Sequence, residues 1–389
     1  MSGGRIRRQG RFLRRFRRAT RAVVTVGNRL RILPEGGELF RRILEAIDAA
    51  ASLICLEFYI IRDDRTGRVI ADRLVAAAAR GVSVYLVYDY IGCFDTPSSY
   101  FRRLQQAGVR LLPFNPLSLR RGVGWLDRRD HRKLLIVDGV RGFTGGFNIG
   151  DEYSGWGDSP PWRDVGIEME GGAVSVLLSL FCQIWYQESG ERLPFADRPF
   201  VTLHPPGDEE VYVVSGGPHH TRSFIRSAFR MAIAGASERV VIATPYFIPG
   251  PRLIRSLIRA ARRGVEVTLI LPAVSDVPLV SLVSRGSYLP LLTEGIRIVE
   301  REGEILHTKI MQIDGSWTVV GSANLDQRSF HRNFELGCIV TGPRFGGEVE
   351  RLLRYELDRS RTVTRHHLAK RGILVRMVER ILSLAASFL

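Results

Sequence analysis

The strongest constraint on this chain is a short polar motif that occurs twice in identical register. His131-Arg132-Lys133 is followed by Asp138, and His307-Thr308-Lys309 is followed at the same distance by Asp314. The second copy lies 176 residues after the first at the histidine, the lysine and the aspartate. A motif repeated in strict register predicts a tandem duplication, and we interpret the copies as two halves facing each other across one active site.

Each copy continues into a glycine-rich segment that ends in asparagine, at Asn148 and at Asn324. Glycine lets the backbone approach a ligand closely and an asparagine amide donates hydrogen bonds, so both asparagines are candidate phosphate-binding residues. Acidic residues recur further along each copy, with Asp164 preceding Val-Gly and Glu335 preceding Leu-Gly. We predict that these two carboxylates orient the histidines through their inner ring nitrogens.

Lysine usage indicates that the motif carries chemistry. Of 56 basic residues only three are lysines, Lys133, Lys309 and Lys370, so two of the three lie in the paired motif. Lysine is a compact point charge whereas arginine is a wide planar fork, so a site that places one charge against one phosphate oxygen has reason to retain lysine. In an extended segment, residues i and i+2 share a face, which puts each histidine beside its lysine.

These residue types suit phosphoryl chemistry without a metal or another cofactor. A neutral imidazole attacks phosphorus, an ammonium neutralises the phosphate oxygens, and the second histidine acts as general acid and then general base. Asp138 and Asp314 have two possible roles, because each closes a short apolar run and precedes glycine. Both are candidate catalytic residues, and the alternative is that they support the strand and its turn.

Hydrophobic periodicity predicts an α/β unit that occurs twice in tandem. Helices are expected at 39–50, 70–80, 225–234 and 253–263, and strands at 53–61, 82–88, 239–243 and 265–271. The predicted domains are a basic arm at 1–25, a first repeat at 26–195, a second repeat at 196–350 and a C-terminal helical segment at 351–389.

The formal charge of +16 predicts a polyanionic partner. Residues 1–21 contain nine arginines and no acid, with Phe12 and Phe16 at helical spacing, which favours an arm whose apolar side chains insert into an anionic membrane surface. A solvated tail or a nucleic-acid-binding arm is the alternative. An apolar stripe from Leu374 to Phe388 suits either the protein core or lipid. Without a spanning segment or a signal peptide, the chain is expected to be peripheral on the cytoplasmic face of the membrane.

At these motifs the chain resembles the phospholipase D superfamily, whose signature is His-x-Lys-x4-Asp-x6-Gly-Gly/Ser-x-Asn in two copies. Both copies match at every position. Further phrases narrow the resemblance to bacterial cardiolipin synthases, in the shorter subgroup without N-terminal membrane spans: Leu56-Glu57-Phe58-Tyr59, Asp130-His131-Arg132-Lys133-Leu134, Pro245-Tyr246-Phe247-Ile248-Pro249 and Asn324-Leu325-Asp326-Gln327-Arg328-Ser329-Phe330.

The resemblance implies that each α/β unit is a mixed sheet flanked by helices. It also implies a two-step phosphatidyl transfer. His131 would attack a phospholipid phosphate while His307 protonates the departing alcohol, and a hydroxyl of phosphatidylglycerol would then resolve the phosphatidyl-histidine to give cardiolipin. Phosphatidylethanolamine is an alternative donor, and phospholipase D-type hydrolysis or nuclease action is an alternative reaction. Nucleic acid is the less favoured partner, because aromatic residues do not alternate with the arginines as base stacking requires.

Overall fold

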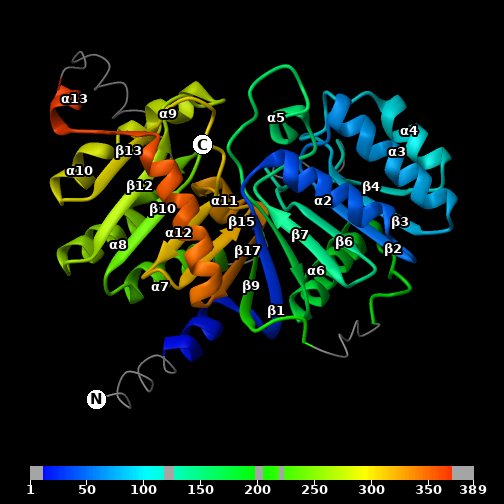
Figure 1. Cartoon of the computed structure of the whole chain (residues 1–389), viewed down its shortest axis with the longest axis horizontal. Coiled ribbons are helices and arrows are strands. Elements are labelled where there is room, and N and C mark those ends of the chain that lie inside the picture. The colour runs from blue at the N-terminus through cyan, green and yellow to red at the C-terminus, as the bar shows by residue number, and fades with distance from the viewer. Residues whose placement is uncertain (1–11, 118–126, 198–204, 219–222, 370–389) are drawn as a thin grey trace. The chain divides into compact units, whose positions relative to one another are not determined.

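A computed structural model of the chain describes residues 12–117, 127–197, 205–218 and 223–369 (Figure 1). These residues form two compact units, and each is described by itself. The first-motif unit comprises Thr25–Val211 and Arg332–Glu335. The second-motif unit comprises the residues up to Val24, Tyr212–His331 and the residues from Leu336 onward.

The sheet of the first-motif unit is mixed. Its strands lie in the order β1-β8-β7-β6-β2-β3-β4, with β2, β3 and β4 parallel and the other neighbours antiparallel. The strands are β1 (Val23–Leu33), β2 (Leu53–Phe58), β3 (Ser83–Asp89), β4 (Arg110–Phe114), β6 (Leu134–Val137), β7 (Arg141–Gly145) and β8 (Gly166–Glu170).

Helices cover both faces of this sheet, because successive apolar side chains of its strands point to opposite faces and both faces need to be buried. Ile54, Leu56 and Phe58 of β2 share one core cluster with α2 (Gly36–Asp48), α3 (Arg65–Ala79) and α4 (Ser98–Gln106). Cys55, which points the other way, lies near Cys182 of α6 (Gly172–Ser189). A short helix, α5 (Asp151–Ser154), follows the glycine-rich segment of the first motif.

The second-motif unit repeats this plan. Its strands lie in the order β18-β13-β12-β10-β14-β15-β17, with β10, β12 and β13 parallel and the other neighbours antiparallel. The strands are β10 (Arg239–Ala243), β12 (Glu266–Pro272), β13 (Arg297–Arg301), β14 (Ile310–Ile313), β15 (Trp317–Gly321), β17 (Asn333–Thr341) and β18 (Ser360–Thr362).

The helices of the second-motif unit also lie on two faces (Figure 1). Val240 and Ile242 share one core cluster with α7 (Phe224–Gly235) and α8 (Gly250–Arg262). On the other face, the Gln312 side chain donates to the Gly346 carbonyl of α12 (Pro343–Asp358) at 2.7 Å. The α9 (Pro278–Arg285) and α10 (Tyr288–Thr293) helices connect β12 to β13.

The predicted α/β duplication is therefore confirmed. All eight predicted helices and strands are present, and their ends lie within a few residues of the predicted ones. The α3 helix begins before the predicted residue 70 because the Asp64 carboxylate accepts from the Gly67 amide and caps the first turn. Both α3 and α8 end before a glycine with positive φ, Gly81 at 89° and Gly264 at 87°, which explains why an Arg-Gly-Val phrase occurs after each.

The described part of the basic arm packs on the protein. Residues 12–20 form a helix, and Phe16 is fully buried with its ring centroid 5.1 Å from Trp317 and 6.0 Å from Tyr212. The prediction that Phe16 inserts into a bilayer is therefore wrong, because this ring is already removed from water by aromatic contacts within the second-motif unit. The predicted apolar stripe at 374–388 lies outside the described residues. Of the helices in the described ranges, none is both long enough and apolar enough to span a membrane.

Replacing Phe16 with alanine should release this helix, because it removes a fully buried aromatic ring. We expect a loss of about 3–5 kcal/mol of packing free energy, or less where the helix detaches as a unit. Thermal unfolding and the rate of tryptic cleavage at Arg14–Arg18 measure it, with Val26→Ala, at a 72% exposed side chain, as the control. Equal cleavage rates in Phe16→Ala and the unmodified chain would contradict the packing.

Candidate active site

The backbone of the first motif is fixed by strand pairing. The β5 strand (Arg129–Asp130) pairs in parallel with the start of β17, and the His131 amide donates to the Phe334 carbonyl at 2.9 Å. Residues 131–133 have no regular secondary structure and connect β5 directly to β6. Their placement at a strand end agrees with the sequence prediction, and it sets His131 next to Glu335.

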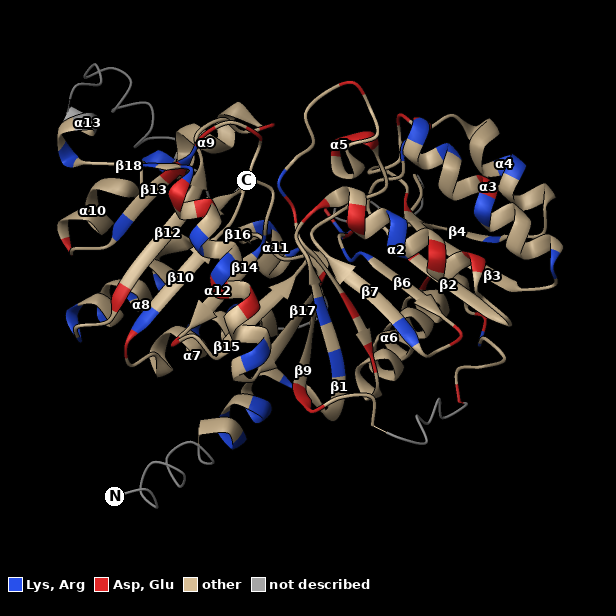
Figure 2. Cartoon of the chain, in the orientation of Figure 1, with Lys and Arg blue, Asp and Glu red and all other residues tan. Residues whose placement is uncertain are grey.

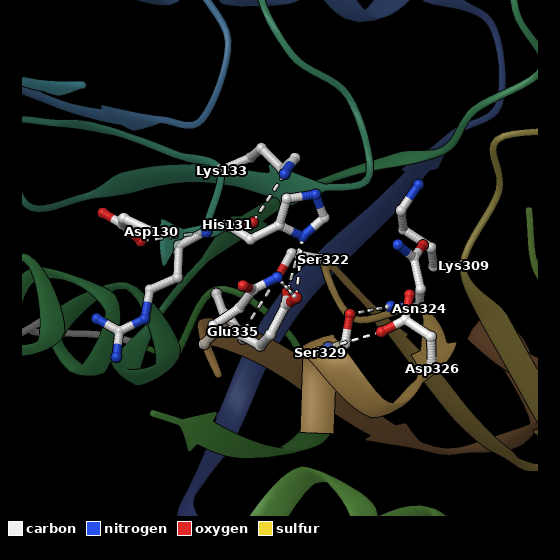
Figure 3. Close-up of polar contacts among 12 residues, drawn as sticks. Asp130, His131, Lys133, Lys309, Ser322, Asn324, Asp326, Ser329 and Glu335 are labelled. Carbon is white, nitrogen blue, oxygen red and sulfur yellow. Dashed lines mark hydrogen bonds and ion pairs between the residues drawn. The ribbon is translucent and has the colours of Figure 1, made fainter. Parts of the chain in front are cut away.

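The His131 ring is held by a buried carboxylate. Its Nδ1 lies 3.0 and 3.1 Å from the two Glu335 oxygens (Figure 3). Asn333 donates to the same carboxylate at 3.3 Å. Because a carboxylate accepts, Nδ1 carries the proton and the lone pair of the neutral imidazole is on Nε2. Glu335 follows the second motif in the sequence, yet it contacts the histidine of the first.

Lys133 and Tyr59 border the same ring. The Lys133 ammonium donates to the His131 carbonyl at 2.7 Å and lies 5.4 Å from the centre of the Tyr59 ring. The Tyr59 ring meets the imidazole edge to face at 5.1 Å. The lysine side chain is buried, so its charge acts in an environment that weakens it less than water does.

A buried ion pair anchors the segment that precedes His131. Asp89, at the end of β3, accepts from the Asp130 amide at 2.9 Å and from Arg129 at 3.2 Å. It also accepts from the amides of Ile91 and Gly92. Burial raises the pKa of Asp89, while the Arg129 charge and these amides oppose that rise. Asp89 thus fixes the position of β5, and through it the motif.

Two buried carboxyls lie close to one arginine beneath the motif. Arg132 lies 3.6 Å from Glu57, and both are almost completely buried. Burial and the neighbouring Glu57 charge raise the pKa of Asp130 well above its ordinary value, with Arg132 opposing. Burial also raises the pKa of Glu57, against the Arg132 charge. The two carboxyls, Asp130 and Glu57, therefore retain a proton at pH values at which an isolated carboxyl would have lost it.

The second motif has the same order of groups in its own unit. Lys309 lies 2.8 Å from His307 Nδ1 and also donates to the His307 carbonyl. The Tyr246 ring meets the imidazole edge to face at 6.4 Å, and its hydroxyl donates to Asp276 at 2.5 Å. Each histidine therefore has its own lysine and its own tyrosine. Across the described ranges, no group of three or more histidine, cysteine or acidic side chains could hold a metal ion.

The two asparagines are not equivalent. Asn148 accepts from the Ile60 amide at 3.2 Å and donates to the Tyr153 hydroxyl at 2.8 Å, so both ends of its amide bind protein. The Asn324 side-chain oxygen is buried without a hydrogen-bond partner in the described ranges, and its backbone amide donates to Ser329 (Figure 3). Of the two asparagines, only Asn324 thus keeps a buried acceptor oxygen without a partner in the described ranges.

The aspartates of both motifs lie at the far end of their strands. Asp138 accepts from the amides of residues 51, 52 and 53, all at 2.8–2.9 Å, and Asp314 accepts from those of 237, 238 and 239. Both adopt positive φ, 52° and 48°, before a glycine. These contacts support the second of the two roles that the sequence left open, in which the carboxylate fixes the start of the neighbouring strand.

Asp164 lies in the first-motif unit, next to the glycine-rich segment. Its carboxylate accepts from the Val165 amide at 2.7 Å, and a side chain at Gly146 would come within 2.2 Å of it. This close approach explains the glycine at position 146. Its role in orienting a histidine stays a prediction.

Sequence reasoning assigned no role to several residues that build the site. Tyr59, Tyr246 and Glu57 occur in phrases that carried the family resemblance, so their residue types were visible but their proximity to a motif was not. Asp326 caps the short helix α11 (Gln327–His331) by accepting from the Ser329 amide at 2.6 Å, which places Ser329 against Asn324. Asp89 had only one signal, a carboxylate at the end of a buried strand.

This fold and its paired motifs define a phospholipase D-like protein. The family described as "Cardiolipin synthase, PLD-like domain" matches residues 43–155 and 229–356, once in each repeat. The chain belongs to this cardiolipin synthase family, and the enzyme class is that of the phosphatidyltransferases.

Individual relatives agree. The chain is 36% identical to cardiolipin synthase 2 of Bacillus cereus over 90% of its own length and 68% of the relative. It is likewise 36% identical to cardiolipin synthase A of Pseudomonas aeruginosa, over 88% and 70%. In fold it is similar to the phosphatidylserine synthase of Haemophilus influenzae, with a TM-score of 0.74, 13% identity and coverage of 97% and 99% of the two chains.

Replacing Asp138 with asparagine should lower stability, because it weakens hydrogen bonds to three backbone amides. Asparagine tolerates positive φ, so backbone strain adds little, and we expect a loss of about 1–3 kcal/mol. Although partial burial raises the pKa of Asp138, the amides of Ala51, Leu53 and Ser52 outweigh it and lower that pKa.

The pH dependence gives this prediction a sign. A carboxylate with a lowered folded-state pKa stabilises the fold above its unfolded pKa of about 3.9 and loses that contribution as pH falls through the folded value. The difference in free energy of unfolding between Asp138→Asn and the unmodified chain should therefore become smaller below about pH 4. Thermal unfolding measured at a series of acid pH values gives this difference, and Asp95→Asn, at an exposed side chain, is the control. A difference in stability that does not change with pH would contradict the prediction.

Proposed function

We propose that the chain transfers a phosphatidyl group from one phosphatidylglycerol to a hydroxyl of a second, through a phosphatidyl-histidine, to form cardiolipin and glycerol. The single observation that carries the assignment of roles is the contact between His131 Nδ1 and the buried Glu335 carboxylate. It supports His131 as the nucleophile, because the lone pair of the neutral ring is on Nε2 and the carboxylate stabilises the positive charge that develops on attack.

In the first step, His131 Nε2 forms a bond to phosphorus and the bond between phosphorus and the glycerol headgroup oxygen breaks. His307 gives its proton to that oxygen, and Lys133 and Lys309 compensate the charge on the phosphate oxygens. The side-chain NH2 group of Asn324 is the donor proposed for the same oxygens, whereas Asn148 holds the segment through Ile60 and Tyr153.

In the second step, His307 removes the proton from a hydroxyl of the acceptor phosphatidylglycerol. The resulting oxygen attacks phosphorus, and the bond between phosphorus and His131 breaks, which restores the enzyme. Asp138 and Asp314 do not touch the reacting atoms in this scheme, and they hold the strands that carry the motifs. Asp164 is proposed to orient a histidine, as Glu335 does. Both substrates are lipids, so we infer that the protein works at the surface of a membrane.

Replacing either His131 or His307 with alanine should abolish turnover, because neither step proceeds without a nucleophile and a proton donor. The measurement is conversion of radiolabelled phosphatidylglycerol vesicles, with and without phosphatidylethanolamine, followed by thin-layer chromatography. The matched control is His366→Ala, at an exposed histidine outside the motifs. Cardiolipin that is absent in both motif variants and present in the control supports the proposal.

Other products would separate the alternatives. Phosphatidic acid as the only product would mean that water resolves the intermediate and that the chain is a hydrolase. Substantial cardiolipin formation by either motif variant would refute the scheme with two histidines.

Replacing Glu335 with glutamine should slow turnover by roughly 10²- to 10⁴-fold, because a neutral amide no longer fixes the proton on Nδ1 or stabilises the imidazolium. The pH profile of kcat should shift as well, which a purely structural role would not cause. Glu170→Gln, which removes a carboxylate paired with Arg29 on the sheet, is the control. An unchanged pH profile together with near-normal kcat would remove Glu335 from the mechanism.

A further inference from the structure

One helical layer of the second-motif unit contains many arginines and no acidic residue. The helix at 12–20, α7 and α8 share a single hydrophobic core cluster through Phe16, Phe229 and Leu257, so all three lie over the same face of the sheet. Figure 2 shows basic positions along α8 and along the N-terminal helix. The arginines of these helices and the residues that end them are Arg14, Arg15, Arg17, Arg18, Arg21, Arg226, Arg230, Arg252, Arg255, Arg259, Arg262 and Arg263.

Much of this charge is not neutralised within the protein. Arg262 pairs with Glu294, and Arg263 donates to backbone carbonyls at the end of α7. For Arg230, Arg252, Arg255 and Arg259, by contrast, the described ranges contain no carboxylate partner, and all four are exposed. Burial and the charges of Arg252 and Arg230 lower the pKa of Arg226, which is the signature of cations crowded together.

These arginines surround two hollows on the surface of α7 and α8. One, of about 390 Å³, is lined by Arg226, Arg252 and Arg255 and reaches Gln327, three residues after Asn324. The other, of about 250 Å³, is lined by Arg230, Arg259 and Arg263 together with Ala19 of the N-terminal helix. Three guanidinium groups around one opening suit an oxyanion with several acceptor oxygens, since each group presents a fork of donors.

We propose that this arginine face, defined as Arg226 and Arg230 of α7 with Arg252, Arg255 and Arg259 of α8, docks the protein on a bilayer by binding the phosphates of anionic phospholipids. The occupant follows from charge complementarity, because an anionic leaflet attracts each basic residue near its surface. The exposed positions of α7 and α8 carry no aromatic side chain on which a nucleic-acid base could stack. The Phe16 packing strengthens the argument, since it leaves the exposed arginines of the N-terminal helix on the same layer.

The test compares two triple variants of the full chain that lose the same charge. The first is Arg252→Gln with Arg255→Gln and Arg259→Gln. The second changes three exposed arginines of α3 and α4 in the first-motif unit, Arg73→Gln with Arg102→Gln and Arg103→Gln. Binding is measured by co-sedimentation with vesicles of phosphatidylcholine alone and of phosphatidylcholine mixed with phosphatidylglycerol, at physiological ionic strength. No turnover is required, so the result is independent of the proposed reaction.

We expect the α8 variant to bind the anionic vesicles roughly tenfold or more weakly, and the α3–α4 variant to bind nearly as the unmodified chain does. Arg255→Glu, a single charge reversal, should weaken binding in the same direction, and thermal unfolding checks that each variant is folded. An equal loss of vesicle binding in the two triple variants would show that binding depends only on net charge, and it would overturn the proposal. Unchanged vesicle binding with a loss of duplex DNA binding in the α8 variant would overturn it too, and would assign the face to nucleic acid.

Discussion

The contact between His131 and the buried Glu335 carboxylate is the interaction on which the first motif depends. It exists because β5 pairs with the start of β17, so the backbone that fixes His131 is also the backbone that presents Glu335. A carboxylate removed from water is costly unless it is paired, and here the imidazole and Asn333 are among its partners. The same pairing therefore satisfies the carboxylate and selects the tautomer of the histidine.

The two motifs separate chemistry from support. Histidine and lysine lie just before a strand, while the aspartate just after it accepts from three backbone amides at the start of the neighbouring strand. One short strand thus links the reacting groups to the scaffold. Two buried ion pairs next to the first motif, Arg129 with Asp89 and Arg132 with Glu57, also support it. Their arrangement is constrained because a buried charge without its partner costs free energy. The doubled motif therefore contains one residue whose contacts are structural.

The two kinds of basic residue occupy different environments in the described ranges of this chain. The two described lysines are buried beside the histidines. Exposed arginines gather on helices that lie far along the sequence from one another but share one core cluster. A surface with many guanidinium groups can bind several phosphates at once, whereas a single buried ammonium group can act on only one. The division of basic residues thus matches the proposed roles, arginine for docking on an anionic surface and lysine for charge compensation at the substrate phosphate.

The sequence by itself determined the duplication, the alternation of helices and strands, and the identity of both motifs, because periodicity, spacing and residue type are local properties. It also showed Glu335 as a candidate. Only the tertiary structure decided that Glu335 contacts His131, that Phe16 packs on Trp317 and Tyr212, and that Asn148 is bound at both ends while Asn324 is not. These outcomes depend on which distant strands pair and which faces are covered, and no local pattern encodes that.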